Sequence, residues 1–306
     1  MNRMNYLKTK QFFWAKFQIG FIFFLFSLSV HAQKGNTASF DSLHILGQQI
    51  LYGADFESRQ AAHNLFYTKI VDLLKQPLAY SLDFEPVKNL VKLVSPDNRF
   101  KIITWNLPTQ ADHYQYFAFV LLNPEKNKEL KLLFELKDKH EEAEKPENKT
   151  YRSATWYGCL YYKIIKTKDK KKEYYTVLGW DGHDSYTNKK VIDVIHFDQR
   201  GDLVFGAPLF EGLKRKQHRV IFEYSKEVSM SLNWNDQVEM IVFDHLSPAD
   251  DKLIDQYAFY GPDMSFDGFK WEKGKWKYFE KIDVKNATRN PGSISRPVER
   301  GLDKKQ

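Results

Sequence analysis

Residues 191–197 of this 306-residue chain run Val191-Ile192-Asp193-Val194-Ile195-His196-Phe197. In an extended strand, successive side chains point to opposite faces of the sheet. Both faces of this stretch are then mainly apolar, which is typical of a central strand that is covered on each side. Asp193 and His196 are polar groups among these hydrophobic residues, and a buried carboxylate must be paired, hydrogen-bonded or protonated. We interpret both as satisfied internal groups, with a catalytic role for Asp193 as the alternative.

Aromatic and β-branched runs of the same kind lie on both sides of this stretch, separated by turn residues. They predict strands near residues 99–105, 115–122, 131–136, 154–166, 173–180, 190–197, 218–225, 228–234, 238–243, 256–260 and 268–279. The strands follow one another through short loops, so we predict a mainly β (α+β) fold with a large antiparallel meander. An open barrel, a sandwich and a propeller-like array all fit this pattern.

The chain ahead of the strands has a different period. Apolar residues recur at threes and fours, so residues 33–94 are predicted to form a helical N-terminal segment before a β domain at 95–284. Asp55, with Ser58 three positions on, predicts the start of one helix, and Gln76-Pro77 predicts its end. His44 and His63 fall in these helices, and we expect them to face solvent or to cap.

The N-terminus predicts export. Its first sixteen residues carry four basic side chains and no acid, residues 17–30 are almost entirely apolar, and Val30-His31-Ala32 follows. This is the pattern of a cleavable signal peptide over residues 1–32, with an uncleaved anchor as the alternative. The apolar run is short for a membrane span. We therefore expect a periplasmic or secreted protein without a transmembrane segment after signal cleavage.

Charge and cysteine content limit the function classes. The net charge of +7 comes from 46 basic and 39 acidic residues. Without the four basic residues of the leader it falls to +3, which argues against a nucleic-acid partner. The single cysteine, Cys159, permits no internal disulfide, and its bulky neighbours predict a small buried hydrophobe. Residues 285–306 have almost no hydrophobic side chains and are predicted to be a disordered tail.

Familiar catalytic and zinc signatures do not occur in the sequence. The densest group of oxygen ligands is Asp181, Asp184, Asn188 and Asp193, which could supply four ligands to calcium. Lys189 and Lys190 bring positive charge close to this group, and an ordinary Asp-Gly turn is the alternative. No other cofactor is predicted.

A second group of candidates lies near the predicted strand ends toward the C-terminus. Asp244 and His245 are adjacent, so in a strand their side chains point to opposite faces and cannot pair with each other. His245 can still meet an acid from elsewhere, such as Asp263 or Asp267. Structural turns are the alternative interpretation.

The chain holds 17 Tyr, 24 Phe and 7 Trp. Aromatic side chains at the edge of a β platform can bind a glycan or a peptide, whereas the same residues also fill β cores. Five tryptophans fall in or beside predicted strands and are candidates for either role: Trp156, Trp180, Trp234, Trp271 and Trp276.

Several phrases of the sequence occur together in a recognisable way. They are Ser95-Pro96-Asp97 with Phe100 to Asn106, Tyr161 to Ile164, Leu178 to Gly182, Val220 to Ser225, Ile241 to Leu246 and Tyr260 to Asp263. In these phrases the chain resembles uncharacterised exported proteins of Bacteroidota over most of its mature length. The resemblance implies a cell-envelope or periplasmic setting and implies no activity or site residue.

The leading functional hypothesis is a binding module for an envelope glycan or a partner protein. The alternatives are a structural envelope component and an exported hydrolase with its site among Asp181, Asp184, Asp193, Asp244, His245, Asp263 and Asp267. A hydrolase requires titratable groups that converge in a deep pocket, and a binding module requires a shallow aromatic face with these acids spread among separate turns. A structural component requires an exposed apolar patch or an edge strand.

Overall fold

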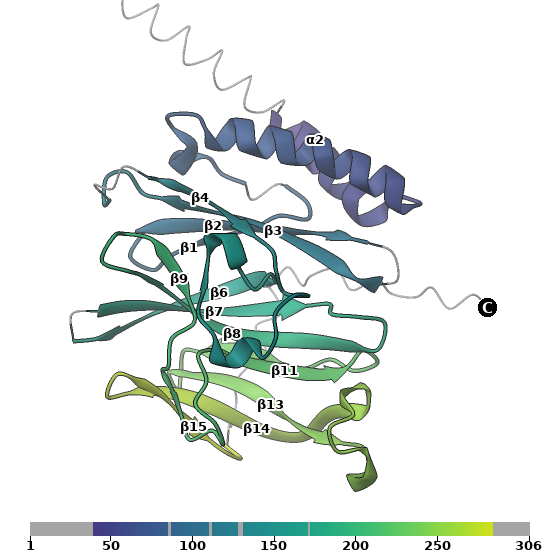
Figure 1. Cartoon of the computed structure of the whole chain (residues 1–306), viewed down its shortest axis with the longest axis vertical. Helices are drawn as coiled ribbons and strands as arrows, with labels where there is room; N and C mark the ends of the chain where they lie inside the picture. Colours follow the sequence, from purple (N-terminus) through teal and green to yellow (C-terminus); the bar gives the residue numbers. More distant parts are fainter. Residues whose placement is uncertain (1–38, 85–86, 110–111, 128–130, 171, 284–306) are drawn as a thin grey trace, which may run out of the picture.

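The computed structural model describes residues 39–84, 87–109, 112–127, 131–170 and 172–283. The predicted signal peptide and C-terminal tail lie outside these residues. The described chain is mainly β, with two N-terminal helices followed by three sheets, and this confirms the predicted fold class. The helices and the sheets are stacked in four layers (Figure 1).

The first sheet is a four-stranded meander in chain order. Its strands are β1 (Val91–Val94), β2 (Phe100–Pro108), β3 (Tyr114–Leu122) and β4 (Leu133–Lys137). The helix of residues 39–52 and α2 (Phe56–Leu74) pack on one face of this sheet. The predicted cap is confirmed, because the Ser58 amide donates to Asp55 Oδ1 at 2.7 Å.

The second sheet forms the centre of the stack. Its strands are ordered β5 (Tyr151–Arg152), β9 (Leu203–Phe205), β8 (Thr187–Phe197), β7 (Lys172–Asp181) and β6 (Leu160–Asp169). β11 (Val220–Ser225) also pairs with β8, through the residues that precede the β9 pairing.

The third sheet closes the stack on the far side. Its strands are ordered β10 (Phe210–Glu211), β15 (Lys275–Phe279), β14 (Tyr260–Glu272), β13 (Met240–Pro248) and β12 (Leu232–Asn235). The β10–β15 pair is parallel, and the other pairs of named strands are antiparallel.

Strand β8 shows why the sheets stack. Val191 and Ile195 join the core between the first and second sheets, and Ile192 and Val194 join the core between the second and third. All four side chains are fully buried. The prediction of a central strand covered on both faces is therefore confirmed, and the molecule is a sandwich of three sheets with a helical outer layer.

Several element boundaries differ from the predictions. The first strand begins at Val91, inside the segment predicted as helical. Residues 257–259 form a 3₁₀ turn where a strand was predicted. The single strand predicted over 268–279 is a β14–β15 hairpin, because Lys273 and Gly274 adopt φ angles of 50° and 81° and form a tight turn. Aromatic side chains continue to alternate with other residues across that turn, so the sequence pattern did not reveal it.

His63 contradicts the expectation that it faces solvent or caps a helix. It lies on the buried stripe of α2 with Arg59, Ala62 and Phe66, and its ring is 4.1 Å from that of Phe117. Burial lowers the pKa of His63 to about 4. The expectation rested on residue type, whereas the helical spacing of His63 places it on the face that covers the first sheet. His44 is partly exposed and lies 3.3 Å from Gln48 Nε2.

Candidate functional site

Asp193 is paired inside the stack. Its Oδ2 lies 3.1 Å from Arg219 Nε, and both side chains are fully buried. Asp193 Oδ1 accepts a hydrogen bond of 2.7 Å from the Val194 amide. Arg219 also donates to the carbonyl oxygens of Pro146 and Lys149, so it ties a long connection to the second sheet. These contacts pair the Asp193 carboxylate with Arg219 by charge, while Oδ2 itself accepts no hydrogen bond within the described residues. His196 is also buried, which lowers its pKa to about 4, and its Nδ1 has no hydrogen-bond partner within the described residues, so the interpretation of His196 as a satisfied group is not confirmed.

The four candidate calcium ligands do not converge. Asp181 is fully buried at the end of β7, while Asp184 lies in the next turn and accepts hydrogen bonds from two backbone amides. Asn188 and Asp193 are five residues apart on β8, which is about 17 Å along a strand. Within the described ranges, no group of three or more His, Cys, Asp or Glu side chains is arranged to hold a metal ion.

A lysine lies beside the turn that holds Asp184. Lys189 Nζ is 2.8 Å from His183 Nε2 and 3.5 Å from Glu223 Oε2. His183 Nε2 is itself 3.7 Å from Asp184 Oδ2. The ammonium group therefore supplies positive charge close to these acids, as the sequence position of Lys189 suggested.

The structure brings His245 and Asp267 together. His245 Nδ1 lies 2.7 Å from Asp267 Oδ2, which also accepts a hydrogen bond of 2.6 Å from the Tyr278 hydroxyl. The Asp267 side chain is 3% exposed and that of His245 is 35% exposed. Asp244 and Asp263 lie apart from this pair: Asp244 accepts from the Ser231 amide, and Asp263 accepts from the Ser265 amide and hydroxyl.

A buried carboxylate that orients an exposed imidazole is one part of a hydrolytic site. A nucleophile within hydrogen-bond reach of the imidazole is another part. Across the ranges that the structure describes, no hydrogen bond joins His245 to a Ser, Thr or Cys side chain. Cys159 is fully buried, and burial raises the pKa of its thiol well above the ordinary value, as suits the small hydrophobe that was predicted.

One group of titratable residues was not found from the sequence. Asp138 accepts hydrogen bonds from His140 Nδ1 at 2.8 Å and from the amides of Tyr116 and Gly158 at 2.9 and 3.2 Å. The Tyr116 hydroxyl in turn donates to Asp181 Oδ1 at 3.0 Å. The His140 side chain is only 6% exposed. These groups come from β3, from the end of β7 and from the connection after β4, and only the Asp-x-His spacing of Asp138 and His140 marked them in the sequence.

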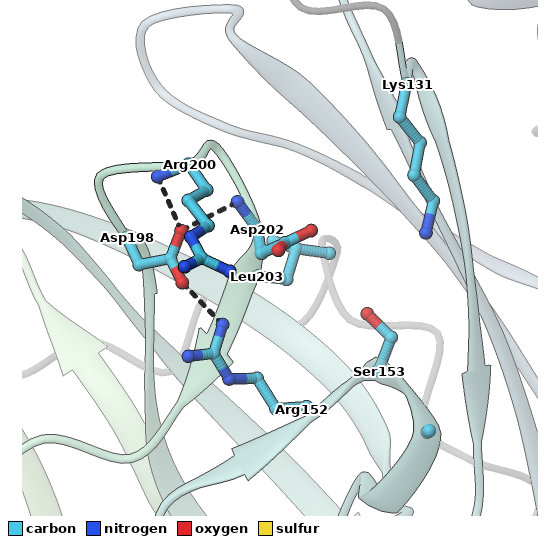
Figure 2. Close-up of a pocket in the computed structure, with 8 residues that line it drawn as sticks. Lys131, Arg152, Ser153, Asp198, Arg200, Asp202 and Leu203 are labelled. Carbon is cyan, nitrogen blue, oxygen red and sulfur yellow. Dashed lines mark hydrogen bonds and ion pairs between the residues drawn. The ribbon is translucent and has the colours of Figure 1, made fainter.

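A polar surface depression of about 550 Å³ lies beside the turn between β8 and β9. Arg152 Nη1 and Asp198 Oδ2 form an ion pair of 2.6 Å on one side of it, and Figure 2 shows Lys131 on the opposite side. No aromatic side chain is among the residues that line it: Lys131, Arg152, Ser153, Ala154, Asp198, Arg200, Asp202 and Leu203. A sugar ring therefore finds no stacking partner in this depression.

The five tryptophans mostly fill the cores. Trp156, Trp180 and Trp276 are buried, while Trp234 and Trp271 are partly exposed. Most of the tryptophans that were candidates for a glycan-binding face therefore fill the β cores instead.

Exposed apolar side chains are frequent in residues 254–266, which cover part of the connection after β13 and the first half of β14. Five of them, 38–95% exposed, form what we call the β13–β14 surface: Ile254, Tyr257, Phe259, Met264 and Phe266. The turns that carry the first three project from one end of the third sheet (Figure 1). Val228 is also exposed and lies next to this surface, because a Cβ atom on Gly261 would be 3.6 Å from its Cγ2.

A β-bulge shapes this surface. Asp244 pairs with Phe266 and Leu246 pairs with Pro262, so three residues of β14 lie opposite His245 alone. Met264, the middle one, is 95% exposed and has a φ of 71°. A bulky side chain in this left-handed region is strained, and such strain is concentrated at functional sites.

Neither a protein-family model nor a curated protein matches the chain. Among the helices that the structure describes, none has the length and apolar character to span a bilayer.

Proposed function

We propose that this protein is an exported interaction module that binds a partner protein through the β13–β14 surface. The observation that supports this proposal is the gathering of five exposed large apolar side chains within residues 254–266. Single exposed hydrophobic residues are ordinary, whereas a contiguous exposed group marks an interaction site. Tyr, Phe and Met are also the side chains that interfaces favour.

Charge supports the same surface and indicates the kind of partner. Residues 249–266 contain four Asp residues and one Lys, which is a net charge of −3. The acids Asp250, Asp251, Asp255 and Asp263 are all exposed. The matching surface on the partner should therefore be apolar at its centre, with Lys or Arg at its rim.

The other functions considered have less support. The tryptophans proposed for a glycan face are mostly buried, and the depression of Figure 2 has no aromatic lining. The His245–Asp267 pair has an oriented imidazole, but within the described residues no nucleophile is hydrogen-bonded to it. A purely structural component remains the closest alternative, since it also uses an exposed apolar patch.

Site-specific photo-crosslinking tests the proposal. A photoreactive phenylalanine analogue is placed at position 264 in the full chain, expressed in the cells that produce it. The matched control carries the analogue at Leu78, which is 74% exposed but lies beyond α2, on the helical layer. We expect a discrete crosslinked protein from position 264 and none from position 78. Equal crosslinking from both positions, or none from position 264, would contradict the proposal.

Export is tested separately on the same cells. A mature N-terminus at Gln33 supports cleavage after Ala32, and an intact N-terminus in the membrane fraction supports the anchor instead.

A further inference from the structure

Asp138 is the centre of a compact set of contacts between three parts of the chain. It accepts hydrogen bonds from the His140 amide at 3.0 Å and from His140 Nδ1 at 2.8 Å. It also accepts from the Tyr116 amide of β3 and from the Gly158 amide. A Cβ atom at 158 would lie 2.1 Å from Asp138 Oδ1, so any larger residue at this position would displace the carboxylate. The carboxylate thus holds the connection after β4 against β3 and against residues 156–158.

A second carboxylate, which is buried, lies close to this set. Asp181 is fully buried, and its Oδ1 accepts from the Tyr116 hydroxyl and from the His183 amide, each at 3.0 Å. Its Oδ2 is also buried and has no hydrogen-bond partner within the described residues. A buried carboxylate in this condition is costly unless a positive charge lies nearby.

His140 is a titratable group that can supply such a charge. Its ring packs edge-on against Tyr116 and Tyr157, with centroids 5.2 and 6.2 Å away. Burial disfavours the imidazolium, but the hydrogen bond to Asp138 and the charges of Asp181, Asp138 and Glu141 outweigh it, so the pKa of His140 is raised above 6.5. Burial raises the pKa of Tyr116, Tyr157 and Cys159, so these neighbours stay neutral.

We propose that Asp138, His140 and Asp181 form a proton-operated latch, which fastens residues 138–145 to the first and second sheets while His140 is protonated. Loss of the proton removes the positive charge that His140 holds 2.8 Å from Asp138 and weakens the hold of Asp138 on His140. This inference is independent of the β13–β14 surface.

The far end of the connection is fastened by other means. Arg219 donates to the carbonyl oxygens of Pro146 and Lys149, and the His218 amide donates to that of Glu147 at 2.6 Å. Arginine stays charged at every accessible pH. Deprotonation of His140 should therefore loosen residues 138–145 and leave residues 146–149 in place.

The sign of the pH dependence follows from the raised pKa. The latch contributes fully below pH 6.5, where the unfolded and folded states both carry the proton, and its contribution is lost as the pH rises through the folded pKa of His140. His63 and His196 have pKa values of about 4, so they titrate on the acid side and do not overlap with this window.

The test is residue-resolved amide exchange by NMR on the full chain between pH 5.5 and 9, expressed as protection factors. The reporters are the amides of Lys139, His140 and Gly158, which donate to Trp156 O and to Asp138. The controls are the amides of Lys149 and His218, which donate to Pro146 O and Glu147 O in the fastened part. We expect the reporters to lose protection with rising pH, about tenfold for each unit by which the pKa is raised, while the controls keep theirs.

Two variants separate the latch from ordinary packing. His140→Gln keeps a donor near Asp138 but removes the proton, so its reporters should show no pH transition. Asp181→Asn removes one charge at constant shape and should move the transition of His140 to lower pH. If either variant fails to fold, the titration of His140 in the wild-type chain decides. A pKa of 6.5 or below, or reporters and controls that lose protection together, would overturn the proposal.

Discussion

Replacing Asp193 by Asn removes one charge of a pair that has no access to solvent. The Arg219 side chain is also completely buried, and its Nε lies 3.1 Å from Asp193 Oδ2. The substitution therefore leaves the guanidinium charge buried without its acidic partner. Breaking a buried pair by removing one partner costs about 3–5 kcal/mol. Domains are stable by about 5–15 kcal/mol, so this substitution should remove about a fifth or more of the free energy of unfolding.

Urea unfolding followed by tryptophan fluorescence measures this effect. Trp156 and Trp180 are buried in the core between the first and second sheets, and Trp276 is buried in the core between the second and third. The fluorescence signal therefore reports unfolding of the stacked sheets. The double variant Asp193→Leu with Arg219→Met should recover part of the loss, since no uncompensated charge remains. Recovery should be incomplete, because the carbonyl groups of Pro146 and Lys149 lose their donor. A loss below about 1 kcal/mol for Asp193→Asn would refute the account of this pair.

Two further predictions concern titration and metal binding. His63→Leu should reduce acid sensitivity, because a folded pKa of about 4 against an ordinary 6.5 means that stability is lost as the pH falls between these values, by about 3 kcal/mol for this group. His196 has a similar pKa and keeps its own contribution in this variant. Urea unfolding at pH 7 and pH 4 checks this, and an unchanged pH dependence would count against burial of the His63 imidazole. EDTA should leave the midpoint of thermal unfolding of residues 33–306 unchanged. The reason is that the four candidate calcium ligands do not converge: Asp181, Asp184, Asn188 and Asp193. A rise of several degrees in the midpoint on adding millimolar calcium would restore the metal hypothesis.

The sequence predicted those parts of the fold that depend on residues close together in the chain. The alternation of residues 191–197 identified β8 as a strand covered on both faces, and Asp55 with Ser58 identified the start of α2. Very short strands such as β5 and β10 were missed, because two residues carry no period. Which sheet each strand joins depends on pairings between distant residues, and no single stretch of the chain records them.

The candidate site residues show the same limit. Adjacent side chains in a strand point to opposite faces, so the sequence excluded Asp244 as the partner of His245 and left Asp267 as one candidate. The structure joins His245 to Asp267. Asp181 was grouped with its neighbours in sequence, but its side-chain partner is Tyr116 on β3, 65 residues away. His140 lies in residues 137–150, which are highly charged, and such a segment predicts a solvated loop instead of a buried imidazole.

The central claim concerns the β13–β14 surface, and crosslinking from position 264 in two matched variants tests it most directly. One variant carries Phe259→Ser and Phe266→Ser on this surface, and the other carries Leu65→Ser and Leu78→Ser on the helical layer. All four side chains are exposed, so neither pair should change stability by more than about 1 kcal/mol. We predict that the first variant loses the crosslinked partner and that the second retains it. Retention of the partner by both variants would contradict the claim.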